Sequence, residues 1–171
     1  MGASAAYHLA KRGVKDVVLL ERETLGSGST SKSAGGIRAQ FADELNVRIA
    51  LRSMAEFQAL DRVSGIDYKR HGYLFLLTNE VDAENFRAAL VVQHKLGVPS
   101  HMISPDDVKY LVPGLETSDL LAAAYCPIDG HASPESVVQA YSGAAAAQGV
   151  KILQGTSLER IAVLGDKIVS I

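Results

Sequence analysis

Apolar and polar positions along the chain follow helical and strand periods in turn. Small and apolar residues fill 2–12 before a stop at Gly13, which predicts a helix with a glycine C-terminus. The short apolar run 16–21 predicts a strand buried on both faces. The same reasoning predicts further helices at 43–63, 82–96, 104–112 and 133–149, strands at 72–78, 120–126 and 150–153, and a hairpin over 157–171.

Composition and charge narrow the class of protein. With 47% hydrophobic and 21% charged residues, the chain can bury a core and is not disordered. A formal net charge of −2, without any basic block, excludes a nucleic-acid groove. No apolar run in the sequence approaches the roughly 20 residues of a transmembrane helix. The single cysteine, Cys126, permits no internal disulfide, which favours a cytoplasmic location, and no spacing resembles a metal site.

Candidate chemistry lies near the start of the chain. Gly2 opens the first predicted helix, and Glu21 ends the following strand 19 residues later. In a dinucleotide-binding unit this spacing lets the glycine bring helix and sheet close together and places the acid on the ribose hydroxyls. The Gly/Ser/Thr-rich stretch 24–36 then predicts a ligand-binding loop, because compact domains seldom keep so long a loop without a function. A flexible linker, and a chance helix followed by a strand ending in Glu, stay open as alternatives.

The N-terminal sequence MGASAAYHLAKRGVKDVVLLERETLGSGSTSKSAGGIR resembles that of FAD-dependent oxidoreductases of the D-amino-acid oxidase superfamily, above all sarcosine oxidase β-subunit-like and L-proline dehydrogenase β-subunit-like members. The stretches 36–41 (GIRAQF), 129–134 (DGHASP) and 147–161 (AQGVKILQGTSLERI) extend the resemblance over essentially the whole chain. It implies an α/β fold: a partial, doubly wound (Rossmann-like) FAD-binding region at 1–65, part of an α+β mixed-sheet substrate domain at 66–132, and a return to the FAD-binding region at 133–171 that ends in an incomplete antiparallel meander.

The resemblance also implies which residues contact the cofactor. FAD would be noncovalent, since the loop 24–36 holds no histidine, the residue through which some members attach the flavin. Glu21 would bind the adenosine ribose, with Arg22 beside the adenine, and loop hydroxyls and main chain would face the pyrophosphate, ribityl chain and flavin ring. The implied contacts are Gly2, Glu21, Arg22, Ser27, Thr30, Ser31, Gly35, Gly36, Ile37 and Leu158.

The implied activity is oxidation of a small amine or amino acid, such as sarcosine, proline or a D-amino acid, by hydride transfer to flavin N5. Arg38 is a candidate anchor for the substrate carboxylate, because a guanidinium fork suits that group, while a surface arginine closing the loop is an equal alternative. His71 and His131 are interpreted as hydrogen-bonded turn residues and Cys126 as a buried small apolar residue. A nicotinamide-dependent Rossmann dehydrogenase and a non-catalytic remnant or interaction module stay open as other classes.

Against the family pattern, the sequence starts just before the third glycine of the fingerprint and stops before a second glycine-rich FAD contact. We therefore expect an N- and C-terminally truncated piece of a flavoenzyme, inactive by itself and binding FAD more weakly than about 1 µM. The strand at 17–20 is expected beside the strand at 150–153. Its other edge would then be unpaired, which predicts self-association or a partner subunit.

Overall fold

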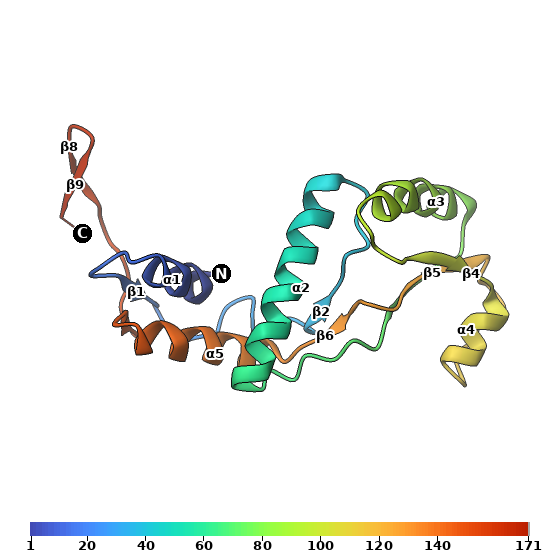
Figure 1. Cartoon of the computed structure of the whole chain (residues 1–171), viewed down its shortest axis with the longest axis horizontal. Helices are drawn as coiled ribbons and strands as arrows, with labels where there is room; N and C mark the ends of the chain where they lie inside the picture. The colour runs from blue at the N-terminus through green and yellow to red at the C-terminus, as the bar shows by residue number, and fades with distance from the viewer. Residues whose placement is uncertain (171) are drawn as a thin grey trace. The chain divides into compact units, whose positions relative to one another are not determined.

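The computed structural model describes residues 1–170 and divides the chain into two compact units (Figure 1). The first unit combines residues 1–34 with the segment from 133 onward, and the second comprises 35–132. The functional division expected from the sequence keeps 35–65 with the first region, whereas chain contacts place them in the second unit. The reason is packing, because Val47 and Met54 of this stretch belong to the core of the second unit.

The first unit packs two helices on a parallel pair of strands. The helices are α1 (Gly2–Lys11) and α5 (Pro134–Ala147), and the strands are β1 (Val18–Leu20) and β7 (Lys151–Leu153). Leu19 is the register partner of Ile152, so the predicted pairing of these strands is confirmed. Ala6 of α1, Ala145 of α5 and Val150 form the buried core between helices and strands.

The prediction that β1 is buried on both faces is wrong. Successive strand residues point to opposite faces, and Val17 and Leu19 pack towards the helices. Val18 points to the other face and is 45% exposed. Within residues 1–170, helices cover one face of this strand pair. The predicted C-terminal hairpin is confirmed: β8 (Ala162–Leu164) and β9 (Lys167–Ser170) pair antiparallel.

The second unit is built on an antiparallel sheet of order β3-β5-β4, comprising β3 (Tyr73–Leu77), β5 (Ala122–Cys126) and β4 (His101–Ile103). Its helices are α2 (Glu44–Ser64), α3 (Glu80–Lys95) and α4 (Pro105–Leu111). A separate two-residue ladder joins β2 (Gly36–Ile37) to β6 (Gly130–His131). The predicted helices and longer strands are confirmed to within a few residues. Strands β2, β4 and β6 were not predicted, because two or three residues carry too little periodicity.

Side-chain caps fix where the helices of the second unit begin. Asp43 accepts a hydrogen bond from the backbone N–H of Asn46 at 2.9 Å and so starts α2. Ser104 and Asp107 form a reciprocal capping box at the start of α4. The hydrogen bonds from Ser104 lower the pKa of Asp107. Asp106 and Asp107 thus stand in the first turn of α4.

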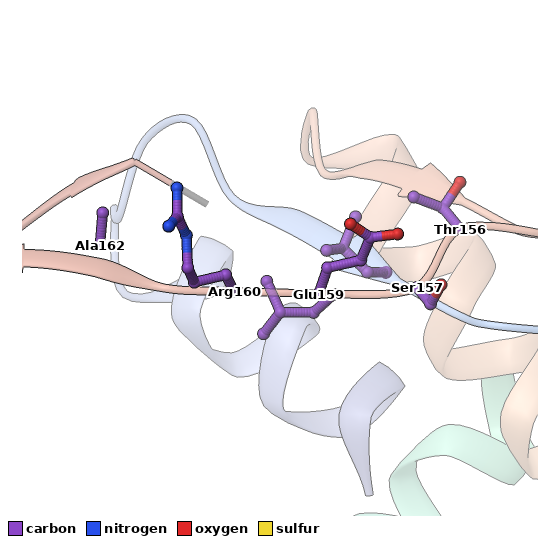
Figure 2. A pocket seen from close by; sticks show the side chains of 7 residues that line it. Thr156, Ser157, Glu159, Arg160 and Ala162 are labelled. Atoms are coloured by element: carbon purple, nitrogen blue, oxygen red, sulfur yellow. The ribbon is translucent and has the colours of Figure 1, made fainter.

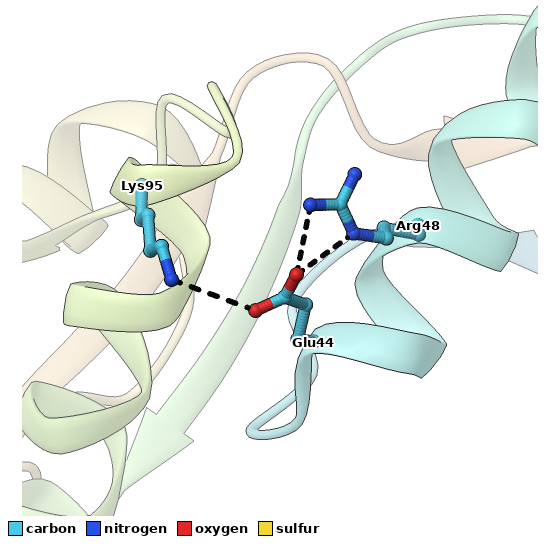
Figure 3. Close-up of polar contacts among 3 residues, drawn as sticks. All are labelled: Glu44, Arg48 and Lys95. Atoms are coloured by element: carbon cyan, nitrogen blue, oxygen red, sulfur yellow. Dashed lines mark hydrogen bonds and ion pairs between the residues drawn. The ribbon is translucent and has the colours of Figure 1, made fainter.

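An exposed ion-pair cluster links the beginning of α2 to the end of α3 (Figure 3). The Glu44 Oε1 atom accepts from Arg48 Nε at 2.9 Å and Nη2 at 2.8 Å, and its Oε2 lies 3.7 Å from Lys95 Nζ. The Arg48 hydrogen bond lowers the pKa of Glu44. Because all three side chains are solvent-accessible, this cluster orients the two helices more than it stabilises them. No helix of residues 1–170 has the length and apolar character that crossing a bilayer requires.

We expect Gly130→Ala to destabilise the second unit. An added Cβ would overlap the carbonyl oxygen of Lys69, whose bridge to His131 would have to shift. Such main-chain overpacking costs about 1–3 kcal/mol or more. In the control, Gly143→Ala in α5, the new Cβ meets nothing within 4 Å, so helix propensity should stabilise the chain by up to about 1 kcal/mol. Urea denaturation measures both changes, and a Gly130→Ala chain as stable as wild type would contradict the prediction.

Candidate functional site

In the first unit, the carboxyl ends of β1 and β7 gather most of the residues predicted to bind a nucleotide. Each helix precedes the strand that it covers and runs antiparallel to it, so the N-termini of α1 and α5 lie at this edge. At the start of α1, a Cβ on Gly2 would lie 3.2 Å from Leu19 Cδ1. The glycine therefore allows a close helix–strand approach, as the third glycine of a dinucleotide-binding fingerprint does.

Glu21 follows β1 and is held by main-chain bonds to the segment after β7. Its N–H donates to the Leu153 carbonyl at 2.9 Å, and its carbonyl accepts from the Thr156 N–H at 3.0 Å. The half-buried side chain accepts a hydrogen bond at Oε1 from the Glu23 N–H at 2.9 Å. Within residues 1–170, Oε2 has no hydrogen-bond partner, so one carboxylate oxygen is available to a hydroxyl group. Arg22, the next residue, is exposed.

A cavity of about 460 Å³ opens beside this edge (Figure 2). Figure 2 shows the labelled side chains of 156–162 along one extended segment. Leu158, one of the implied cofactor contacts, lines this cavity together with Leu20, the residue before Glu21. The lining mixes apolar side chains with hydroxyls and the charges of Glu159 and Arg160. Such a surface suits a flat heterocycle with polar edges.

The loop after β1 is a series of hydrogen-bonded turns. The Ser31 N–H donates to the Gly26 carbonyl at 3.0 Å, and the Leu25 N–H donates to Gln154 Oε1 at 2.7 Å. Gly26 adopts φ 87°, a left-handed conformation that glycine accepts without strain. These bonds fold the loop on itself and tie it to the end of β7, so the flexible-linker interpretation is wrong for 24–33.

This loop and the beginning of α5 line a second cavity, of about 430 Å³. Ser27, Thr30 and Ser31, three of the implied cofactor contacts, line it together. The hydroxyl of Ser31, however, points back to the loop and donates to the main-chain carbonyls of Ser27 and Gly28, both at 3.0 Å. Sequence reasoning missed the residues from α5 in this cavity, Ser133, Pro134 and Glu135. A helix start more than 100 residues away carries no local signal.

In the second unit, Gly35 and Gly36 follow the loop, and Gly36 is the first residue of β2. Gly36 pairs with His131 and Ile37 with Gly130, while the Gly35 carbonyl accepts from the Ala132 N–H at 3.1 Å. A Cβ on Gly36 would lie 3.2 Å from Tyr73 Cε2. The side chain of Ile37 packs against the core of the unit. Among Gly35, Gly36 and Ile37, the exposed residue is therefore Gly36, whose main chain is accessible.

The Arg38 side chain lies against the rings of Phe41 and Phe75, which together form an aromatic platform. Its guanidinium carbon is 5.0 Å from the ring centroid of Phe75 and 5.4 Å from that of Phe41. The side chain is half-buried and makes no ion pair with the residues that the structure describes. The aromatic side chains of Tyr73, Phe75 and Tyr125 on this sheet are half-buried. Phe75 packs against Phe86 of α3 and also contacts the guanidinium group of Arg38.

Asp129 is the residue that sequence reasoning missed. Its buried carboxylate accepts from the Ala39 N–H at 2.9 Å through Oδ1 and from Gln40 Nε2 at 3.1 Å through Oδ2. Burial raises the pKa of Asp129, and these two hydrogen bonds offset part of that rise. Since 90 residues separate Asp129 from Ala39, no local pattern could have paired them.

Cys126 and the two histidines offer no separate chemistry. Cys126 is buried, as predicted, and desolvation together with the nearby Asp129 charge raises the pKa of its thiol to about 11. The thiol is therefore protonated at neutral pH and a poor nucleophile. His71 and His131 are exposed, with ring centroids 5.7 Å apart. The described residues contain no cluster of three metal-ligating side chains.

Comparison with known proteins defines the class. The FAD dependent oxidoreductase family matches residues 1–171, the whole of the chain, so the chain belongs to this family. The expected α/β fold of an FAD-dependent oxidoreductase is confirmed by structural similarity. The crystal structure of L-proline dehydrogenase from P. horikoshii superposes with a TM-score of 0.91 and 36% identity over 97% of this chain, which corresponds to 44% of that protein.

Curated relatives share the same region. The chain is 32% identical over its full length to the pyruvate dehydrogenase phosphatase regulatory subunit of Mus musculus, of which it covers 20%. It is 29% identical over 97% of its length to the sarcosine dehydrogenase of Mus musculus, of which it covers 18%. The chain thus spans about a fifth of the length of these curated relatives.

We expect the buried Asp129 carboxylate to make stability fall as pH rises. The raised pKa means that the folded chain favours the protonated form, a stabilisation complete below the ordinary value of 3.8 and lost as pH rises through the folded pKa. Urea denaturation between about pH 4 and pH 7 should show the wild-type free energy of unfolding falling relative to that of Asp129→Asn.

Asp107→Asn is the opposite control. The lowered pKa of Asp107 means that its contribution is present above the ordinary value and lost as pH falls. The difference in free energy of unfolding between wild type and Asp107→Asn should therefore shrink as pH falls. Parallel pH profiles for wild type and Asp129→Asn would show that the Asp129 carboxylate titrates alike in the folded and unfolded chains.

Proposed function

We propose that this chain supplies part of the FAD site of an oxidoreductase acting on a small amine or amino acid. The observation that carries the proposal is the placement of Glu21, with a free carboxylate oxygen, at the same strand edge as the close-packed glycine of α1. The family match supports FAD over the nicotinamide alternative. FAD bound here would supply the acceptor for a hydride from the carbon next to the substrate nitrogen, and water would hydrolyse the resulting imine.

The residues of the first unit suit noncovalent binding of the nucleotide half. In this proposal, Glu21 takes the ribose hydroxyls, and the cavity lined by Leu158 takes the adenine, with Arg22 at its side. Glu135 stands in the first turn of α5 and lines the second cavity, where a carboxylate disfavours phosphate. That cavity, with the Ser27 and Thr30 hydroxyls, is therefore better suited to the hydroxylated ribityl chain than to the pyrophosphate.

The residues of the second unit suit the substrate and the flavin ring. The main chain of Gly35, Gly36 and Ile37 is proposed to approach the ring, supported by the space that Gly36 leaves uncovered. Arg38 is proposed to bind the substrate carboxylate. Its support is the half-buried guanidinium, which two aromatic rings contact and which forms no ion pair with the residues that the structure describes. An arginine held this way presents two parallel N–H donors to a carboxylate.

The substrate class, the partner and the compartment of the protein are also proposals. The named substrates of relatives, sarcosine and L-proline, are small amino acids with a secondary amine, and we propose this class for the protein. A non-catalytic role is the second candidate, favoured by one observation: a relative carries the name of a regulatory subunit. A cytoplasmic location stays a prediction, and both mouse relatives are named as mitochondrial proteins.

In a protein of its relatives' full length that contains this chain, Glu21→Ala should weaken FAD binding about ten- to a hundredfold. The reason is the loss of charge-assisted hydrogen bonds to the ribose hydroxyls, worth roughly 1.5–3 kcal/mol. Equilibrium titration followed by flavin fluorescence gives the Kd, and flavin retention through gel filtration gives an independent check. Glu23→Ala, which removes an exposed carboxylate two residues away, should bind FAD as wild type does. Equal Kd values for Glu21→Ala and wild type would remove Glu21 from the site.

We also propose that the chain self-associates through β1. This strand pairs with β7 on one side, and within residues 1–170 its other edge makes no strand pairing. A short apolar edge without proline or inward charge is a template for intermolecular pairing. Light scattering over a range of concentrations should show an apparent mass that rises with concentration. A concentration-independent monomer would refute this role of β1.

A further inference from the structure

The short segment that carries Arg38 is held on both sides by one stretch of chain, 129–132. On its N-terminal side, the Gly35 carbonyl accepts from the Ala132 N–H, and Gly36 and Ile37 pair with β6. On its C-terminal side, the Ala39 N–H donates to Asp129 Oδ1 at 2.9 Å. The main chain at Arg38 therefore lies between two fixed points, and Asp129 provides the second of them.

Gln40 couples the same segment to the aromatic platform. Its Nε2 donates both to Asp129 Oδ2 and to the main-chain carbonyl of Tyr73, each at 3.1 Å. Tyr73 begins β3, and Phe75, two residues later, lies under the Arg38 guanidinium. The buried amide thus joins the backbone that carries the arginine to the strand that carries its stacking partner. If the Asp129 carboxylate is removed, Ala39 and Gln40 each lose an acceptor.

We propose that Asp129 is a positioning residue: through Ala39 and Gln40 it holds the Arg38 guanidinium on Phe41 and Phe75, with its N–H donors free to bind a small carboxylate. The inference rests on the proposed role of Arg38 as the carboxylate anchor. Asp129 does not touch the ligand. It sets the orientation of the group that does, and orientation decides whether two parallel N–H···O bonds form.

A purely structural role for Asp129 makes a different prediction. A carboxylate that only stabilised the fold would change the free energy of unfolding and leave carboxylate affinity untouched in chains that remain folded. Positioning requires that affinity fall in the folded chain while the platform residues stay in place. The two roles therefore separate when binding is measured at a temperature and urea concentration where each variant is folded.

The experiment uses the ¹⁵N-labelled 171-residue chain, titrated with acetate as a minimal carboxylate and with acetamide as its neutral counterpart. The Arg38 Nε–H resonance reports binding where the arginine is present, and the backbone amide resonances of 36–41 report it in every variant, Arg38→Gln included. Hydrogen exchange of the Ala39 amide reports the hydrogen bond to Asp129. The variants are Arg38→Gln, Asp129→Ala and Asp129→Asn. Asp61→Asn is the matched control, because Asp61 also accepts from a backbone N–H, that of Tyr68 at 3.1 Å. Arg70→Gln controls for a second arginine in the same unit.

For wild type we expect acetate, and not acetamide, to shift the Arg38 resonance. Asp129→Ala should weaken acetate about tenfold and speed exchange of the Ala39 amide at least tenfold, with the two control variants unchanged. Asp129→Asn is a milder substitution, and it tests the proposal if the Asp129→Ala chain does not fold. It keeps an acceptor for Ala39 but turns an amide N–H₂ towards Gln40, so it should weaken acetate with little change in Ala39 exchange.

The outcomes separate the two claims. If wild type does not respond to acetate, or if Arg38→Gln leaves its affinity unchanged, the proposed anchor is wrong and the positioning role falls with it. If Arg38→Gln abolishes binding while both Asp129 variants, shown to be folded, bind acetate as wild type does, the positioning role alone is overturned and the proposed function stands. A loss of affinity in the Asp61→Asn control as well would assign the effect to general destabilisation and overturn the inference.

Discussion

The hydrogen bond from the Ala39 N–H to the buried Asp129 carboxylate is the contact on which the second unit's candidate site depends. Burying a charged carboxylate is costly unless donors compensate it, and here a backbone N–H and a side-chain amide do so. Few other conformations would supply the carboxylate with these hydrogen-bond donors. The cost of burying it therefore favours the observed conformation over the others. Strand β2 and Arg38 lie within two residues of Ala39 in the sequence, and the neighbouring Gln40 donates to the carbonyl of Tyr73 at the beginning of β3.

The first unit depends on a different constraint, the close approach of α1 to β1. A Cβ added to Gly2 would lie only 3.2 Å from Leu19 Cδ1, which is a tight contact. A longer side chain would push the helix away from the strand and away from the edge where Glu21 ends β1. Parallel pairing with β7 then brings 154–162 to the same edge, although that segment lies more than 130 residues further along the chain. The two halves of this edge therefore come from distant parts of the sequence.

Family membership and local geometry answer different questions about this protein. The match over residues 1–171 and the structural likeness to a proline dehydrogenase establish the class and the fold. They do not assign roles to individual side chains. The roles proposed for them rest on local geometry: one oxygen of Glu21 has no hydrogen-bond partner among the described residues, the hydroxyl hydrogen of Ser31 is engaged within its own loop, and Arg38 contacts two aromatic rings without forming an ion pair to a described residue.

The sequence by itself determined the helices, the longer strands, the loop at 24–36 and the pairing of 17–20 with 150–153, because periodicity, caps and glycine stops are local signals. The spacing of Gly2 and Glu21, which made them candidates for a nucleotide site, is a local signal too. Only the tertiary structure decided that Val18 is exposed, that α5 contributes to the loop cavity, that Arg38 rests on two aromatic rings and that Asp129 holds Ala39. Each of these depends on segments far apart in the chain, and burial and hydrogen-bond partners at such separations are set by packing and not by neighbouring residues.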